Sequence, residues 1–329
     1  MSRYDEEAKY DRPKRRTRPR TKDRPAYDDA VTGFVITRDR GRYTTWVGEG
    51  DRVVTAMKAR QLGRKGVIVG DLVKLDGDAS GAEGSLARIV EVLPRTTLLR
   101  RSADDDDPVE RPLVANADQL VIVVAVANPE PRTRLIDRFL VAAYDAGMRP
   151  LLCLTKTDLA DPEPLLSKYR PLGVESVATQ QGGSLDELVE QLHDRTSVLV
   201  GHSGVGKSTL VNGLIPGAGR AIGVVNEVTG RGRHTSTSTL VLRLPAGGWI
   251  VDTPGIRSFG LAHVEPDQLI HAFPDLAEEV TNCPRGCTHS ETEPSCALDE
   301  AVAAGRVESE RVASFRRLLA SREGRPEPV

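Results

Sequence analysis

The chain has 329 residues, of which 39% are hydrophobic and 28% are charged, and its formal net charge is −2. This length predicts two or three domains, and the composition excludes a chain too polar to bury a core. The longest apolar run, at 120–127, is far shorter than the ~20 residues of a membrane-spanning helix. No apolar signal segment follows the charged first residues, so we expect a cytoplasmic protein without a membrane partner.

The first predicted segment, residues 1–29, is a disordered basic tail. Between Arg12 and Arg24 it carries eight cations and a single acid, Asp23, interrupted by prolines. Such a run cannot bury a core. It is either a solubilising tail or a flexible arm attracted to nucleic acid phosphates.

Residues 30–101 show short strand-like runs without a convincing helix, which predicts a small β-barrel. The expected strands lie within 31–37, 43–48, 67–75 and 85–93. A linker at 100–112 follows, with four consecutive aspartates at 104–107 that we expect to stay solvated.

From 112 to 260 strands alternate with helices, which predicts a mostly parallel sheet covered on both faces. After Arg134 a helix is expected, because apolar residues recur along one face. The expected strands are 120–127, 150–155, 174–177, 197–200, 239–244 and 248–252.

A phosphate-binding loop is the strongest motif of this α/β segment. The apolar strand SVLV leads into GHSGVGKS, where glycines let backbone N–H groups close around phosphates. A helix beginning at Lys207 adds the positive end of its dipole. We expect Lys207 to contact the β- and γ-phosphates and Ser208 to hold Mg²⁺. The predicted phosphate-binding residues are Gly201, His202, Ser203, Gly204, Val205, Gly206, Lys207, Ser208 and Thr209.

A second phosphate-site motif, DTPG at 252–255, ends the strand 248–252. The Asp252 carboxylate is expected to reach Mg²⁺, and the Gly255 N–H to contact the γ-phosphate. The intervening stretch TGRGRHTSTST offers Thr235 or Thr237 as a further Mg²⁺ ligand. The residues predicted for catalysis are Lys207, Ser208, His234, Thr235, Asp252 and Gly255.

TKTD at 155–158 is similar to the guanine-reading motif Asn-Lys-x-Asp, with Thr155 in place of the usual Asn. Asp158 would accept two hydrogen bonds that guanine offers and adenine does not, while the Lys156 stem would lie against the base. Ser176, near the end of the run VESV, is expected at the loop that closes over the base. The predicted guanine-binding residues are Thr155, Lys156, Thr157, Asp158 and Ser176.

The guanine motif precedes the phosphate loop here, the reverse of the order in ordinary GTPases. In a parallel sheet, binding residues gather at the carboxyl ends of the strands, whatever their order along the chain. Cutting the chain after DTPG and joining the old ends leaves that edge intact. The order of motifs therefore predicts a circularly permuted P-loop GTPase.

Residues 261–329 are predicted to form a helical zinc-binding domain. Its cysteine cluster offers three thiolates and one imidazole, which fill a tetrahedral Zn²⁺ shell and indicate a structural site. The predicted ligands are Cys283, Cys287, His289 and Cys296. The remaining cysteine, Cys153, lies in an apolar strand, so the pattern is not a disulfide framework.

Together these motifs resemble the RsgA family of circularly permuted GTPases of the small ribosomal subunit. The likeness rests on TKTD, GHSGVGKSTL, GRGRHTSTST, DTPGIRSFGL and the cysteine cluster, and runs from about Val31 to the last helix. It implies an N-terminal OB-fold, GTP and GDP as ligands, and Mg²⁺ and Zn²⁺ as metals. It also implies late 30S maturation, 16S rRNA as a partner, and hydrolysis stimulated by the ribosome.

An RNA partner is also indicated by aromatic and basic residues. OB-folds bind nucleic acid with a basic groove and stacking aromatics, and Tyr43 and Trp46 are candidates, although Trp46 is equally explained as a core residue. The cations of the barrel segment are Arg38, Arg40, Arg42, Lys58, Arg60, Arg64 and Lys65. Those of the final helix are Arg311, Arg316 and Arg317.

Two alternatives remain: a P-loop ATPase or nucleotide kinase, and a non-catalytic RNA-binding scaffold. Asp158 argues against the first, and the complete set of Lys207, Ser208 and Asp252 against the second. Many GTPases orient the attacking water with a Gln where this chain has Ile256. His234 is the nearby candidate, so we expect a monomer with slow hydrolysis that the 30S subunit accelerates.

Overall fold

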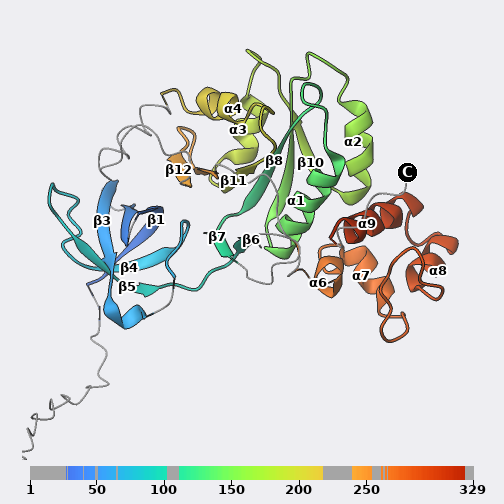
Figure 1. The fold of residues 1–329 in the computed structure, drawn as a ribbon, viewed down its shortest axis with the longest axis horizontal. Helices are drawn as coiled ribbons and strands as arrows, with labels where there is room; N and C mark the ends of the chain where they lie inside the picture. The colour runs from blue at the N-terminus through green and yellow to red at the C-terminus, as the bar shows by residue number, and fades with distance from the viewer. Residues whose placement is uncertain are drawn as a thin grey trace, which may run out of the picture.

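The computed structural model describes residues 27, 29–39, 41–48, 51–63, 66–101, 111–217, 239–253, 261, 264 and 266–322. Figure 1 shows a barrel in blue, a central sheet with helices, and a helical cluster in orange and red. These three parts confirm the predicted fold classes in their predicted order. The basic tail up to Arg24 and the aspartate run 104–107 lie outside the described residues.

Five strands form the closed barrel, with neighbours in the order β1-β2-β3-β5-β4. Their bounds are β1 Val31–Asp39, β2 Arg42–Val47, β3 Arg52–Lys58, β4 Leu72–Gly77 and β5 Ala87–Val92, and a short 3-10 turn, η1, spans Arg60–Leu62. Strand β3 was not expected from the sequence. Its outward Val53 and Met57 are apolar and 46% and 43% exposed, so the alternation that marks a half-buried strand is hidden.

A short two-stranded ladder, β6 (Leu98–Arg101) with β7 (Arg111–Ala115), connects the barrel to the central sheet. Both ends of the predicted linker 100–112 therefore lie in strands. The barrel meets this ladder at Gly70, where φ is +87° and an added Cβ would lie 1.9 Å from the carbonyl oxygen of Ala115. Beside it, Arg95 pairs with the fully buried Asp71 at 2.6 Å. This junction leaves no room for a side chain at position 70.

The central sheet has six strands in the order β10-β9-β8-β11-β13-β12. All pair in parallel except β12, which is antiparallel to β13. Strand β11 lies between β8 and β13, so a strand from late in the chain occupies the middle of the sheet. All six predicted strands form: β8 Gln119–Ala125, β9 Arg149–Thr155, β10 Glu175–Ala178, β11 Thr196–Val200, β12 Leu240–Arg243 and β13 Trp249–Asp252.

Helices cover both faces of this sheet (Figure 1). Along β8, Leu120, Ile122 and Val124 pack in one core cluster, and the alternate residues pack in another. The first cluster includes α1 (Thr133–Asp145) and α2 (Glu163–Tyr169). The second includes α3 (Asp186–Leu192) and α4 (Lys207–Leu214). The sheet is thus covered as the strand–helix alternation predicts.

The C-terminal helices pack on α1, away from the barrel (Figure 1). Their bounds are α6 Pro266–Ile270, α7 Pro274–Val280, α8 Ala297–Ala303 and α9 Ser309–Arg322, and a 3-10 turn, η2, spans Arg170–Leu172. Phe273 lies edge-on to both Tyr144 of α1 and Phe315 of α9, with ring centroids 5.1 and 5.5 Å away. None of the described helices combines the length and the apolar character needed to cross a membrane.

Candidate nucleotide and zinc sites

The phosphate loop lies between β11 and α4, at the carboxyl edge of the sheet. Gly204 and Gly206 have φ of +80° and +98°, values that L side chains rarely adopt. The Lys207 ammonium donates to the carbonyl oxygens of Gly201 at 2.5 Å and His202 at 3.0 Å. Its charge is therefore held inside the curve of the loop. Ser208 and Thr209 are exposed at the start of α4, where a ligand can reach them.

Asp252 ends β13, the strand beside β11. Burial raises its pKa, and the charge of Lys207 opposes this rise. Burial also lowers the pKa of Lys207, against the charge of Asp252. The two charges therefore influence each other across the site. The carboxylate of Asp252 and the hydroxyl of Ser208 are hard oxygen donors of the kind that Mg²⁺ prefers.

The guanine motif meets the phosphate loop directly. Thr155, at the end of β9, is 5% exposed, and its hydroxyl donates to the carbonyl oxygen of Val205 at 2.6 Å. Lys156 adopts a positive φ of 58°, and its ammonium donates to the carbonyl of Asn128. Asp158 is exposed beyond them, open to a base. Two motifs far apart in the sequence thus share one edge of the sheet.

Ser176 does not lie at that edge. It is opposite Leu152 within β10, three residues before the level of Thr155, and β10 continues to Ala178. The assignment of Ser176 to the loop over the base is therefore wrong, because Ser176 is paired inside the strand. The segment that reaches the guanine motif is Thr179, whose carbonyl accepts the backbone N–H and the hydroxyl of Thr157 at 3.3 and 3.2 Å. Gly255, His234, Thr235 and Thr237 lie outside the described residues.

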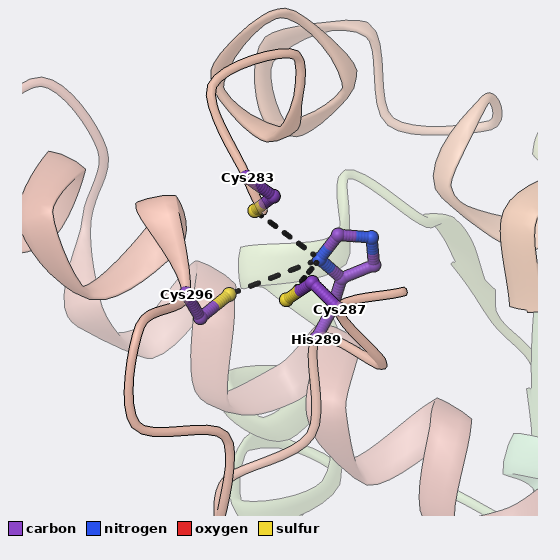
Figure 2. A group of neighbouring side chains, drawn as sticks. All are labelled: Cys283, Cys287, His289 and Cys296. Carbon is purple, nitrogen blue, oxygen red and sulfur yellow. Dashed lines mark hydrogen bonds between the residues drawn. The ribbon is translucent and has the colours of Figure 1, made fainter. Parts of the chain in front are cut away.

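The four predicted zinc ligands come together in the C-terminal domain (Figure 2). Their donor atoms all lie within 4.8 Å of one another. Nδ1 of His289 is 3.4, 3.6 and 3.8 Å from the sulfurs of Cys287, Cys283 and Cys296. Three thiolates and an imidazole fit a closed tetrahedral Zn²⁺ shell, which is structural rather than catalytic.

The cations of α9 have partners within the chain. Arg311 pairs with Asp275 at 2.7 Å, Arg316 with Asp299 at 2.8 Å, and Arg317 with Asp137 at 3.2 Å. Their charges are therefore already neutralised within the protein, and the RNA surface expected on this helix stays a prediction. Arg316 also donates to the carbonyl of His289 at 3.1 Å, which supports the zinc loop.

The aromatic residues of the barrel are not exposed stacking platforms. Tyr43 is buried in the barrel core. Trp46 packs on Trp249 of the central sheet, with ring centroids 5.3 Å apart. No pattern in the sequence pointed to Trp249, because its partner lies in another domain.

Comparisons with known proteins agree with this geometry. The family model described as RsgA GTPase matches residues 92–262. A curated relative from Ectopseudomonas mendocina, named small ribosomal subunit biogenesis GTPase RsgA, is 46% identical over 242 residues, 71% of this chain and 69% of its own. A namesake from Pseudomonas aeruginosa is 44% identical over 71% of this chain and 70% of its own.

Two solved structures are also similar. The crystal structure of YjeQ from Thermotoga maritima has a TM-score of 0.64 and 29% identity, covering 90% of this chain and 100% of that one. YloQ, described as a circularly permuted GTPase, has a TM-score of 0.66 and 26% identity over 91% of this chain and 97% of its own.

Proposed function

The chain belongs to the RsgA GTPase family, and from that premise we propose that it hydrolyses GTP during biogenesis of the small ribosomal subunit. One observation carries the assignment to GTP. The guanine motif and the phosphate loop meet at one sheet edge, joined by the hydrogen bond from Thr155 to Val205. The guanine motif and the phosphate loop can therefore contact the base and the phosphates of one bound nucleotide.

Each chemical role of the nucleotide site falls on a residue of this chain. Asp158 accepts hydrogen bonds from guanine, and the exposed turn of the phosphate loop presents backbone N–H groups to the phosphates. Lys207 places its ammonium against the β- and γ-phosphates. Ser208 and Asp252 hold Mg²⁺, which when bound neutralises charge on the phosphate oxygens. The loop at Thr179, rather than Ser176, closes over the base.

The hydrolysis step is assigned from the sequence. Because Ile256 cannot orient a water molecule, we assign that role to His234 and expect slow turnover that the small subunit accelerates by ordering His234. The 30S subunit and its 16S rRNA are the proposed partners of a monomeric protein. Exposed cations on the barrel support an RNA contact there: Arg38, Arg42, Arg60 and Arg88.

The guanine assignment is tested by Asp158→Asn, assayed with GTP and XTP. An amide keeps one acceptor oxygen but replaces the other with an N–H donor, which opposes the guanine amino group and matches the 2-carbonyl of xanthine, so preference should move from GTP to XTP. Asp161→Asn is the matched control, since Asp161 is exposed a few residues away and, among the described residues, accepts a hydrogen bond from the backbone of Glu163 alone. An Asp158→Asn protein that keeps the parent's preference for GTP would show that Asp158 does not read the base.

The ribosomal assignment is tested by GTP turnover with and without purified 30S subunits. Stimulation by 30S and none by 50S subunits is the expected result. Equal GTP turnover with and without 30S subunits would contradict the small-subunit assignment, whereas the assignment of GTP binding would remain.

A further inference from the structure

The barrel contacts the central sheet through an aromatic cluster. The Trp249 ring, at the start of β13, packs edge-on to Trp46 of β2 at 5.3 Å and lies tilted beside Phe34 of β1 at 5.4 Å. Trp46 and Trp249 are the chain's only two tryptophans. Aromatic pairs in this distance range attract each other beyond their buried area. The barrel therefore holds one defined point of the sheet.

An ion pair lies beside these rings. We call the whole contact the aromatic joint and define it as Phe34, Trp46, Asp51, Arg243 and Trp249. The Arg243 guanidinium lies 5.2 Å from the centroid of Trp46 and pairs with Asp51 at 2.5 Å. Asp51 also accepts the indole N–H of Trp46 at 2.6 Å. The carboxylate thus orients both the ring and the cation that covers it.

The joint lies at one end of a short β-hairpin whose other end reaches the nucleotide site. In the β12–β13 pairing, Arg243 is opposite Trp249, and Leu240 is opposite Asp252. Asp252 lies three positions after Trp249, a span of about 10 Å in an extended strand. Strand β12 is the outer strand of the sheet, so within the described sheet it pairs only with β13. A support from the barrel is therefore well placed to fix the hairpin.

We propose that Trp46 and Trp249 are positioning residues for the nucleotide site: their contact holds the β12–β13 hairpin so that Asp252 meets Mg²⁺ beside the phosphate loop. The proposal rests on the proposed GTPase function and adds a role for the barrel in it. Linkage is reciprocal. Binding of Mg²⁺ and GTP at Asp252 therefore strengthens the aromatic joint and restrains the barrel.

The test measures how binding of a non-hydrolysable GTP analogue depends on free Mg²⁺, by calorimetry. In Trp46→Ala the free Mg²⁺ concentration that gives half of the maximal gain in analogue binding should rise by about threefold to tenfold. This is the range that one aromatic pair contributes. Trp249→Ala should give a similar rise. The double variant should rise little further, because each single substitution already removes the same contact between the two rings. Trp46→Phe retains an aromatic ring and should restore most of the parent behaviour.

Met57→Ala is the matched control. Met57 is also half-exposed on the barrel, in β3, and takes no part in the aromatic joint. Its Mg²⁺ dependence should equal that of the parent. GDP binding in the presence of a chelator should be the same in all variants, since the base and phosphate contacts do not pass through the hairpin. A merely unfolded barrel would instead lower the melting temperature without this Mg²⁺ selectivity.

Fluorescence supplies a readout independent of binding strength. In Trp46→Phe the remaining tryptophan, Trp249, reports on the hairpin, and its emission should shift when Mg²⁺ joins the bound GTP analogue. An unchanged Mg²⁺ dependence in Trp46→Ala and Trp249→Ala, with no emission shift, overturns the proposal. A parent protein that binds no guanine nucleotide overturns the proposed function instead. If either alanine variant does not fold, Arg243→Gln replaces it, with a smaller rise expected.

Discussion

The GTPase domain is joined to its two neighbours in different ways. The C-terminal domain packs on α1 through buried groups: Asp137 is 1% exposed and pairs with Arg317, whose guanidinium lies over the ring of Tyr169. The barrel is joined through the aromatic joint, whose ion pair between Arg243 and Asp51 is half-exposed, at 51% and 68%. Both contacts extend one core cluster, which includes Phe34, Ile36 and Val69 of the barrel, but the charged groups are buried in the first contact and exposed in the second.

This difference separates two mechanical roles. A contact that buries charges tolerates little displacement, because each shift leaves a charge without its partner. The C-terminal domain should therefore move with α1 as one body. Near the nucleotide edge the barrel is held by stacked rings and an exposed ion pair, so it can adjust there by small amounts and follow the hairpin that carries Asp252. The most direct way to examine this contrast is to remove each contact and compare the losses.

The largest effect is expected from Cys287→Ala. Loss of one ligand opens the zinc shell, and metal binding supplies about 10 kcal/mol of folding free energy in small zinc units. Because the C-terminal domain shares a core cluster with α1, the GTPase domain should also melt at a lower temperature. Metal analysis and thermal melting measure both effects. Cys153→Ala, in buried β9, should keep its full zinc content, and a Cys287→Ala protein with full zinc would exclude this ligand set.

The next largest effect is expected from Arg317→Met. The change leaves the Asp137 carboxylate buried without its cation, at a cost of about 3–5 kcal/mol. Its Oδ1 already has no hydrogen-bond partner among the described groups. Chemical denaturation measures the loss. The double variant Asp137→Leu with Arg317→Met should recover most of it, because it removes both charges. A loss of less than about 1 kcal/mol in the single variant would mean that the two joints do not differ in kind.

The destabilisation caused by Arg317→Met should also depend on pH. Burial raises the pKa of Asp137, and the charge of Arg317 opposes the rise. With its pKa raised, folded Asp137 holds its proton to a higher pH than the unfolded chain does, so stability falls as pH rises through that interval. Removing Arg317 raises the pKa of Asp137 further and extends the interval upward. The destabilisation by Arg317→Met should thus be larger at pH 8 than at pH 5, which denaturation midpoints at the two values will show.

A hydrogen bond inside the GTPase domain gives an intermediate reference. Thr155→Val removes the buried bond to Val205, which contributes about 1 kcal/mol, and should weaken GDP binding by about fivefold. The preference for GTP over XTP should not change, since Asp158 is retained. Calorimetry measures both quantities. Thr155→Ser keeps the hydroxyl and should bind as the parent does. A Thr155→Val protein that binds GDP as tightly as the parent would show that this hydrogen bond does not support the phosphate loop.

The smallest effect on stability is expected from Asp51→Asn. Exposed ion pairs contribute little, and the amide oxygen can still accept the indole N–H of Trp46. The melting temperature should stay within the error of the measurement. A destabilisation comparable with that of Arg317→Met would place the barrel joint in the same class as the zinc-domain joint, and the contrast drawn above would be lost.

The sequence predicted the features that depend on neighbouring residues. The six strands of the central sheet, the phosphate loop and the cysteine cluster each carry a local pattern, and the parallel sheet brings Thr155 to the loop. Ser176 was misplaced because strand ends are set by pairing, and the pairing of β10 with β9 extends two residues beyond Ser176. The contacts of Arg317 with Asp137 and of Trp46 with Trp249 join residues from different domains, which no local pattern indicates.

Strand order has a further consequence for biosynthesis. Translation completes β8, β9 and β10 before β11, which fills the middle of the sheet. Until β11 emerges, the apolar β8 keeps one unpaired edge, where another chain can add by strand pairing. In a GTPase with the ordinary order, the phosphate-loop strand is made first. The permutation leaves the finished site unchanged but extends the period in which the nascent sheet has an open centre.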